Sequence, residues 1–217
     1  MPVQFDNVDF RRVKSLRLPL DLNHFFTDLP AERRWNMGVA GSPGAGKSTF
    51  LLFFAAVLCK YGKVLYDNVE EDLNGATLQK KMRDIGLDNR IRVKAIRENF
   101  QFMEDKSIDS LRKELASGKY KYCIIDSASV LQKKNKLKLD DILHLSDEFP
   151  EVSFIYVLHY LKDKSNYKGA SDLEHLFDML LMIEKGGNAY FQKNRFRTFS
   201  PKNIENINIH NYHLSKI

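Results

Sequence analysis

A glycine-rich segment that ends in lysine and serine carries the clearest chemical signal in the sequence. Residues 41–48 read Gly-Ser-Pro-Gly-Ala-Gly-Lys-Ser, which matches the P-loop spacing G-x-x-x-x-G-K-[ST] at every fixed position. Glycines let successive backbone N–H groups curve around a phosphate, and the positive end of the following helix faces the anion. Lys47 would reach the β- and γ-phosphates, and the Ser48 hydroxyl would bind Mg²⁺. We therefore expect ATP and Mg²⁺ as cofactors, held by Gly41, Ser42, Pro43, Gly44, Ala45, Gly46, Lys47, Ser48 and Thr49.

Carboxylates follow two apolar runs further along the chain. Asp126 ends the run Tyr-Cys-Ile-Ile-Asp, and ligands of open α/β sheets bind at the carboxyl ends of the strands. We therefore predict that Asp126 completes the Mg²⁺ site with Ser48. Glu70 and Glu71 follow a second apolar run, and either could orient the water that attacks the γ-phosphate. Spacing does not separate the two glutamates, and the alternative for both is an acidic helix start.

These side chains need a sheet that brings them to one edge, and the sequence has the pattern of such a sheet. Short apolar runs alternate with longer helical stretches, which predicts an α/β fold with a mostly parallel central sheet, helices on both faces and antiparallel strands at the C-terminal edge. We expect parallel strands at residues 36–40, 64–66, 91–95, 122–126, 154–158 and 179–184, helices at 47–61, 73–85, 107–117, 140–149 and 171–177, and antiparallel strands at 189–196 and 204–210.

Length and composition limit the class of protein. The 217 residues are 43% apolar and 29% charged, which excludes both a disordered chain and a membrane bundle. Cys59 and Cys123 lie in apolar runs, as is typical of proteins in a reducing compartment. The net charge of +6 slightly favours binding to polyanions. We expect a cytoplasmic protein without a membrane partner, with an N-terminal extension at residues 1–33 and one ATPase core at residues 34–217.

Together the motifs resemble the RecA-like ATPase core, most closely that of the RadA/Sms family. The resemblance lies in the ordered set of the P-loop, Val64-Leu65-Tyr66 with the glutamate pair, Ile124-Ile125-Asp126-Ser127, and Lys193-Asn194-Arg195-Phe196, and it covers roughly residues 35–200. It implies a RecA-like fold that binds and hydrolyses ATP with Mg²⁺.

The resemblance also implies roles for three further residues. His159 matches a polar residue that senses the γ-phosphate, whereas without the resemblance it would be a satisfied histidine at a strand end. Lys193 and Arg195 match basic residues that reach the γ-phosphate of a neighbouring subunit in ring-forming relatives. Two cations one residue apart on a strand point the same way, although a solvated strand face is the alternative. The catalytic set is then Lys47, Glu70, Glu71, His159, Lys193 and Arg195, in a homo-oligomeric ring or filament.

Three departures from the RadA pattern limit what the resemblance implies. The zinc-binding module and the protease-like domain of RadA have no counterpart in this sequence. Arg197 stands where the last motif ends in glycine, and the segment between Glu71 and Gln79 is a helical turn longer. We therefore expect a minimal or divergent relative.

Lysines gather in two predicted loops, at residues 131–138 and 162–169, each of which follows a predicted strand. The equivalent loops of ring-shaped RecA relatives hold DNA, and lysines bind phosphates by releasing counterions. Tyr167 could stack on a base. The resemblance therefore favours sequence-independent binding of DNA, preferably single-stranded, in recombination, repair or replication, although solvated surface loops are the alternative. The lysines concerned are Lys133, Lys134, Lys136, Lys162, Lys164 and Lys168.

Two other functions remain open at this point. The first is an ATP-switched regulatory ATPase without DNA, similar to the circadian-clock ATPase family, which shares the glutamate pair and the basic residues. The second is a P-loop kinase for a small molecule, because Gly-x-Pro-Gly-x-Gly-Lys also occurs in such enzymes. Against a kinase, the sequence has no evident arginine-rich lid, and Asp126 lies 79 residues after Lys47 (126 − 47).

Overall fold

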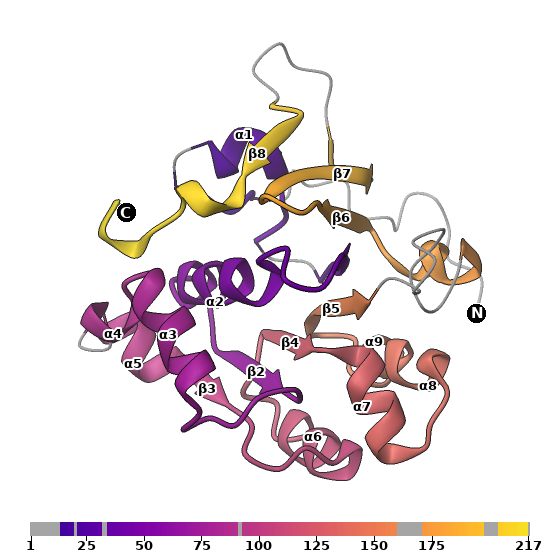
Figure 1. The fold of residues 1–217 in the computed structure, drawn as a ribbon. Coiled ribbons are helices and arrows are strands. Elements are labelled where there is room, and N and C mark those ends of the chain that lie inside the picture. The colour runs from indigo at the N-terminus through magenta and orange to yellow at the C-terminus, as the bar shows by residue number, and fades with distance from the viewer. Residues whose placement is uncertain are drawn as a thin grey trace.

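An eight-stranded sheet forms the centre of the structure, a computed structural model that describes residues 14–19, 21–31, 34–90, 93–159, 171–197 and 204–216. The strand order is β3-β2-β4-β5-β1-β6-β7-β8 (Figure 1). The strands from β3 to β6 in this order are parallel, whereas β7 and β8 are antiparallel additions at one edge. The bounds are β1 Asn36–Gly41, β2 Val64–Asn68, β3 Phe100–Phe102, β4 Tyr122–Asp126, β5 Ser153–His159, β6 Met179–Ile183, β7 Asn188–Asn194 and β8 Asn206–Asn208.

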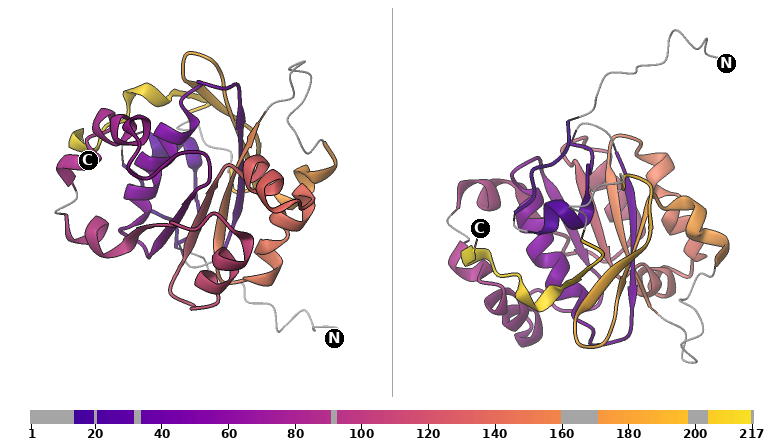
Figure 2. Two further views of the ribbon diagram at one scale, coloured as in Figure 1. Left: turned by 60° about the horizontal axis from the view of Figure 1, so that its bottom comes forward. Right: turned by 90° about the horizontal axis from the view of Figure 1, so that it is seen from above.

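Helices cover both faces of this sheet (Figures 1 and 2). Apolar side chains of α1 to α5 belong to the core on one face, and those of α6 to α9 belong to the core on the other. The central strands are buried along their whole length, as expected for parallel strands between two helical layers. The helices are α1 Leu22–Phe26, α2 Lys47–Leu58, α3 Ala76–Asp84, α4 Leu87–Arg90, α5 Lys94–Asn99, α6 Ile108–Leu115, α7 Ala128–Asn135, α8 Leu139–Leu143 and α9 Leu145–Glu148.

Helix α2, which begins in the P-loop, is buried on all sides. The ring of Phe26 in α1 stacks on Phe54 at a centroid distance of 4.8 Å, and Tyr212 near the C-terminus packs against Phe53 at 5.5 Å. Both ends of the chain therefore fix the helix that positions the phosphate-binding loop. The buried Phe26 shows that part of residues 1–33 packs into the core.

The predicted α/β class, the parallel sheet and the antiparallel C-terminal strands are confirmed, but several boundaries differ. The strand expected at residues 91–95 is wrong: helix α5 begins at Lys94, and the edge strand β3 begins only at Phe100. The reason is that Ile96 packs into the core from a helix, whereas Phe100 and Phe102 both contact the ring of Tyr66.

Two predicted helices and one predicted loop also need correction. Helix α3 begins at Ala76 rather than at residue 73, because a turn closes from the Gly75 N–H to the Asp72 carbonyl at 2.9 Å. The single helix expected at residues 140–149 is divided into α8 and α9 at His144. The loop expected at residues 131–138 is mostly helix, since α7 continues to Asn135 and ends at Lys136 in the left-handed conformation.

No helix in the described ranges has the length and apolar character needed to cross a membrane. Cys59 and Cys123 are both buried as free thiols. Burial raises the pKa of the Cys59 thiol to about 12 and that of Cys123 well above its usual range, so both are packing residues.

Candidate active site

The P-loop connects β1 to α2 and owes its shape to glycine. Gly44 and Gly46 have φ angles of 74° and 93°, in the left-handed region that favours glycine. At Gly46 a Cβ atom would also lie 2.9 Å from Ile209 Cδ1, so a larger residue would be both strained and crowded. The chain therefore makes a tight turn directly before the first residue of α2.

Lys47 opens α2 and points back over this turn. Its Nζ donates hydrogen bonds to the carbonyls of Gly41 at 2.8 Å and Ser42 at 3.0 Å. Burial lowers the pKa of Lys47, while the nearby carboxylates of Asp126 and Glu70 act in the opposite direction. The ammonium group is thus held above the loop with two acidic side chains in its field, where phosphate oxygens could replace the carbonyls as its partners.

A pocket of about 270 Å³ lies over the loop and brings together residues that are far apart in the sequence. Its walls come from the β1–α2 connection, from helix α3, and from the chain at or after the carboxyl ends of β2, β4 and β5. This is the edge at which parallel α/β sheets bind ligands. The lining residues are Pro43, Gly44, Ala45, Gly46, Lys47, Ser48, Thr49, Glu70, Lys81, Asp126 and His159.

Asp126 and Ser48 form the part of this pocket that suits a magnesium ion. Oδ2 of Asp126 accepts a hydrogen bond from Tyr66 Oη at 2.8 Å, and Ser48 lines the same pocket. Burial raises the pKa of Asp126, and the neighbouring hydroxyls of Ser48 and Tyr66 oppose the shift. A carboxylate and a hydroxyl are oxygen ligands of the kind Mg²⁺ prefers when phosphates and water complete its shell. In the described part of the chain, no three His, Cys, Asp or Glu side chains gather as a metal site, so the donors fit a nucleotide-bound ion rather than a protein cage.

The geometry separates the two glutamates that spacing left equivalent. Glu70 lies in the pocket, where its Oε1 accepts a hydrogen bond from Ser127 Oγ at 2.6 Å and lies 2.9 Å from His159 Nε2. The contact with His159 is the main cause that lowers the pKa of Glu70 to about 2. Glu71 instead pairs with Lys81 at 3.0 Å. Of the two glutamates, Glu70 is therefore the one that lines the pocket over the P-loop.

Lys193 and Arg195 lie away from this pocket. Lys193 Nζ donates to the Glu174 carbonyl at 2.7 Å, and Arg195 pairs with Asp178 at 3.3 Å. The expectation that both lie on one strand is wrong, because β7 ends at Asn194 and Arg195 belongs to the turn that follows. Neither residue is among those that line the pocket over the P-loop.

A second pocket, of about 320 Å³, adjoins the first and was not predicted from the sequence. It shares Gly44, Gly46 and Thr49 with the pocket over the P-loop. Aromatic side chains and a segment near the C-terminus supply its other walls, which suits a flat ring next to the phosphates. These walls are Phe50, Phe53, Asp84, Ile85, Ile209, His210 and Tyr212. No motif could reveal this wall, because the chain beyond β8 reaches α2 only through the tertiary fold.

Lys81, Tyr66 and Ser127 are the other site residues that sequence reasoning missed. Tyr66 and Ser127 stand inside or beside the strand motifs that were recognised, but only their hydrogen bonds to Asp126 and Glu70 show a role. Lys81 stands on α3, whose start was predicted three residues too early.

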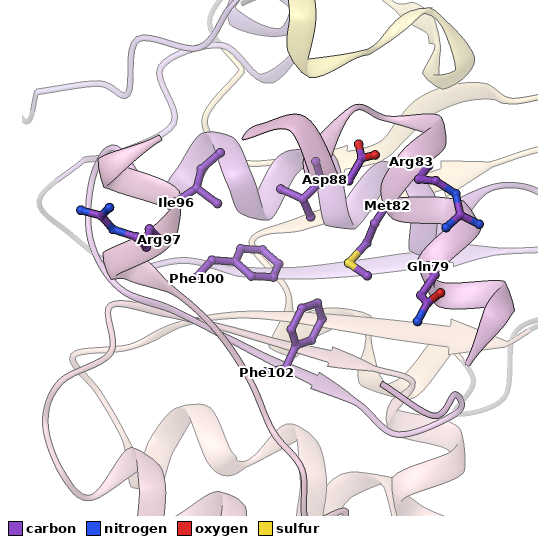
Figure 3. Close-up of a pocket in the computed structure, with 9 residues that line it drawn as sticks. Gln79, Met82, Arg83, Asp88, Ile96, Arg97, Phe100 and Phe102 are labelled. Atoms are coloured by element: carbon purple, nitrogen blue, oxygen red, sulfur yellow. The ribbon is translucent and has the colours of Figure 1, made fainter. Parts of the chain in front are cut away.

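The largest of the three pockets, about 530 Å³, lies at the β3 edge of the sheet (Figure 3). Met82 and Arg83 of α3, Ile96 of α5, and Phe100 and Phe102 of β3 point toward it. Its walls are mostly apolar, so it does not suit a triphosphate. Helix α3 thus lines all three pockets, since Lys81 lines the pocket over the P-loop and Asp84 lines the second pocket.

Comparisons with known proteins found similar sequences among curated proteins. No protein-family model matches the chain. The DNA repair protein RadA of Campylobacter jejuni is 29% identical over 157 residues, which cover 67% of this chain and 33% of RadA. RadA of Helicobacter pylori is also 29% identical, over 159 residues with the same coverage. The chain spans about a third of the length of these curated relatives.

Solved structures show the same fold over most of the chain. A KaiC-like protein from Pyrococcus horikoshii has a TM-score of 0.66 at 14% identity and covers 87% of this chain and 92% of its own. The flagellar accessory protein FlaH from Methanocaldococcus jannaschii has a TM-score of 0.65 at 16% identity, with coverages of 90% and 93%. The chain has a RecA-like fold and is similar in sequence to RadA. The predicted fold and resemblance are confirmed.

The lysines predicted to bind DNA are only partly within the described residues. Lys133 and Lys134 lie on α7 and Lys136 caps its C-terminus. Lys134 is engaged within the protein, since its Nζ donates to the Val69 carbonyl at 2.7 Å. Tyr167, Lys162, Lys164 and Lys168 lie outside the described residues.

Proposed function

We propose that this RecA-like core binds ATP with Mg²⁺ and hydrolyses it. The observation that carries the proposal is the convergence of Lys47, Ser48, Asp126 and Glu70 on one pocket above a glycine turn. These four groups supply a cation for the phosphates, two oxygen ligands for the metal and an ionised carboxylate for water. The relation to RadA supports the same chemistry.

Each side chain has a distinct task in this mechanism. Lys47 exchanges its contacts with the Gly41 and Ser42 carbonyls for oxygens of the β- and γ-phosphates. Ser48 and Asp126 hold Mg²⁺, which when bound neutralises charge on the phosphate oxygens. Glu70 accepts a hydrogen bond from the attacking water. Because the pKa of the Glu70 carboxyl is low, this side chain orients the water rather than holding a proton taken from it.

The second pocket gives the nucleoside a place next to the phosphates. Because it shares Gly44, Gly46 and Thr49 with the P-loop pocket, a nucleotide can occupy both. We assign the base to the walls formed by Phe50, Phe53 and Tyr212, where aromatic contacts favour a purine ring.

Assembly and DNA binding are further parts of the proposal. Lys193 and Arg195 do not line the P-loop pocket of their own chain. In the proposed ring or filament, they would instead complete the site of a neighbouring subunit. DNA would contact Lys133 and Lys136, together with Lys162, Lys164 and Lys168, by charge alone. The support for DNA is that the relatives are DNA repair proteins.

A regulatory ATPase that acts without DNA is the second candidate. It is favoured by the two structural neighbours, a KaiC-like protein and a flagellar accessory protein, which match nine-tenths of the chain although their sequences differ widely. The two candidates share the ATP chemistry and differ in the response to DNA.

Rates of ATP hydrolysis with and without single- and double-stranded DNA test the proposal. Wild-type protein should hydrolyse ATP. Lys47→Ala should abolish hydrolysis, because it removes the buried ammonium group of the P-loop that would bind the phosphates. Single-stranded DNA should raise the rate, and Lys133→Ala/Lys136→Ala should reduce the salt dependence of DNA binding. A hydrolysis rate that does not change when DNA is added would support the regulatory candidate. The absence of hydrolysis in every condition would contradict both proposed functions.

A further inference from the structure

Two lysines from different parts of the chain hold the main chain on either side of Glu70. Lys134, in the last turn of α7, donates to the Val69 carbonyl at 2.7 Å. Lys106, in the connection between β3 and α6, donates to the Glu71 carbonyl at 2.7 Å. Glu70 therefore stands between two peptide carbonyls that each accept a charge-assisted hydrogen bond.

A buried carboxylate explains why two ammonium groups gather here. Asp67 in β2 is 1% exposed, and neither of its oxygens has a hydrogen-bond partner among the described residues. Lys106 and Lys134 are the two cations that act most strongly on it. When Asp67 is ionised, its charge favours both lysines at this place, where their N–H groups meet the carbonyls of the Glu70 segment.

Helix α7 contacts this segment at both of its ends. Ser127, the residue directly before α7, donates to the Glu70 side chain at 2.6 Å, and Lys134 binds the Val69 carbonyl from the last turn. The Val69 N–H in turn donates to the Asp126 carbonyl at 2.8 Å. The backbone and the side chain of Glu70 are therefore fixed by the same helix.

We propose that Lys134 and Lys106 are positioning residues that hold Glu70 at the geometry needed to orient water. This inference rests on the proposed function of Glu70 in ATP hydrolysis. Charge-assisted hydrogen bonds are stronger than neutral ones, and a displacement of about 1 Å at a reacting group costs roughly a hundredfold in rate. Two such bonds at the adjacent peptides restrict the carboxylate without touching the nucleotide.

Hydrogen exchange in the nucleotide-free protein tests the tether directly. Lys134→Met removes the ammonium group but keeps a long side chain, and Lys113→Met, at an exposed position in α6, is the matched control. Exchange of the Val69 and Glu71 amides should accelerate about tenfold in Lys134→Met and in Lys106→Met, and should stay at the wild-type rate in Lys113→Met. Lys134→Arg, which keeps the charge, should restore most of the protection.

Steady-state kinetics test the consequence for catalysis. Lys134→Met and Lys106→Met should lower kcat about tenfold with little change in KM for ATP, while Lys113→Met should leave both unchanged. Wild-type exchange in both methionine variants, alongside normal hydrolysis by the wild type, would overturn this inference alone. A wild-type protein that hydrolysed no ATP would overturn the proposed function and, with it, the catalytic part of the inference.

Discussion

Glu70 and Glu71 show how much one residue's surroundings decide its chemistry. They are adjacent, identical in type and follow the same strand, yet Glu70 meets Ser127 and His159 in the pocket while Glu71 pairs with Lys81. Spacing alone left both as candidates, because the direction of a side chain after the end of a strand depends on the path of the loop. That path is set here by Lys106, Lys134 and the Asp126 carbonyl, none of which is near Glu70 in the sequence.

The two glutamates should therefore respond differently to the same substitution. Glu70→Gln should lower the rate of ATP hydrolysis by a hundredfold or more, on the order of a general-base contribution, while nucleotide affinity stays close to wild type. Glu71→Gln is the matched control, since it removes only a partly exposed ion pair with Lys81. The measurements are hydrolysis rate and affinity for a fluorescent ADP analogue. Equal losses of turnover in the two variants would contradict the assignment of Glu70.

Asp67 should make the stability of the protein depend on pH. Burial raises the pKa of its carboxyl from 3.8 to about 7 in the folded state. Between about pH 4 and pH 7 the folded protein keeps this proton and the unfolded chain loses it, so the free energy of unfolding falls as pH rises through this window. The shift corresponds to a loss on the order of 4 kcal/mol, and the contribution is constant above about pH 7.

Urea unfolding of Asp67→Asn at several pH values between 5 and 8 measures this contribution. The variant should lose less stability than the wild type over this range, because its amide does not titrate. Asp109→Asn, at an exposed position in α6, should follow the wild-type profile. Parallel profiles for the wild type and Asp67→Asn would show that Asp67 titrates at its ordinary value.

At the scale of elements, buried strands were predictable and the edge of the sheet was not. The strand predicted at residues 122–126 agrees with β4, because an apolar run that is covered on both faces has no competing helical pattern. Residues 91–95 read Ile-Arg-Val-Lys-Ala, an alternation of apolar and basic residues that is too short to separate a strand from the start of a helix. Tertiary packing resolved this ambiguity, by placing Ile96 on a helix and giving the edge position to Phe100–Phe102.

Helix α1 should contribute strongly to stability although it is only five residues long. Phe26 is fully buried, stacks on Phe54 and packs edge-on against Phe191 of β7 at 5.3 Å. Phe26→Ala should lower the free energy of unfolding by about 3–5 kcal/mol, as for other buried phenylalanines. Val93→Ala, at a position that is 38% exposed, is the control and should have little effect. A Phe26→Ala protein as stable as this control would show that α1 does not belong to the folded core in solution.

At the scale of the whole molecule, the pocket over the P-loop contains Lys47 but neither Lys193 nor Arg195, the other two cations that the sequence predicts for the site. The P-loop, Asp126 and Glu70 meet at one edge of the sheet, so the conserved geometry of a parallel sheet made these parts predictable. Lys193 and Arg195 lie on and after β7, beyond β1 and β6 in strand order. A sequence gives no information on a site shared between subunits except through resemblance, and this explains why their role stays a prediction.

Mixing two inactive variants tests whether neighbouring subunits share a site. Arg195→Ala should hydrolyse ATP slowly but bind nucleotide normally, because Arg195 does not line its own pocket. Lys47→Ala lacks a functional P-loop and keeps an intact Arg195. In a mixed assembly, an interface that pairs the P-loop of the first variant with Arg195 of the second has every predicted group, so hydrolysis should exceed that of either protein alone and should rise with protein concentration. Size-exclusion chromatography with differently tagged chains would establish that mixed assemblies form. If they form and the activity is only the sum of the two variants, Arg195 does not act across a subunit interface, and its ion pair with Asp178 is then sufficient to account for its position.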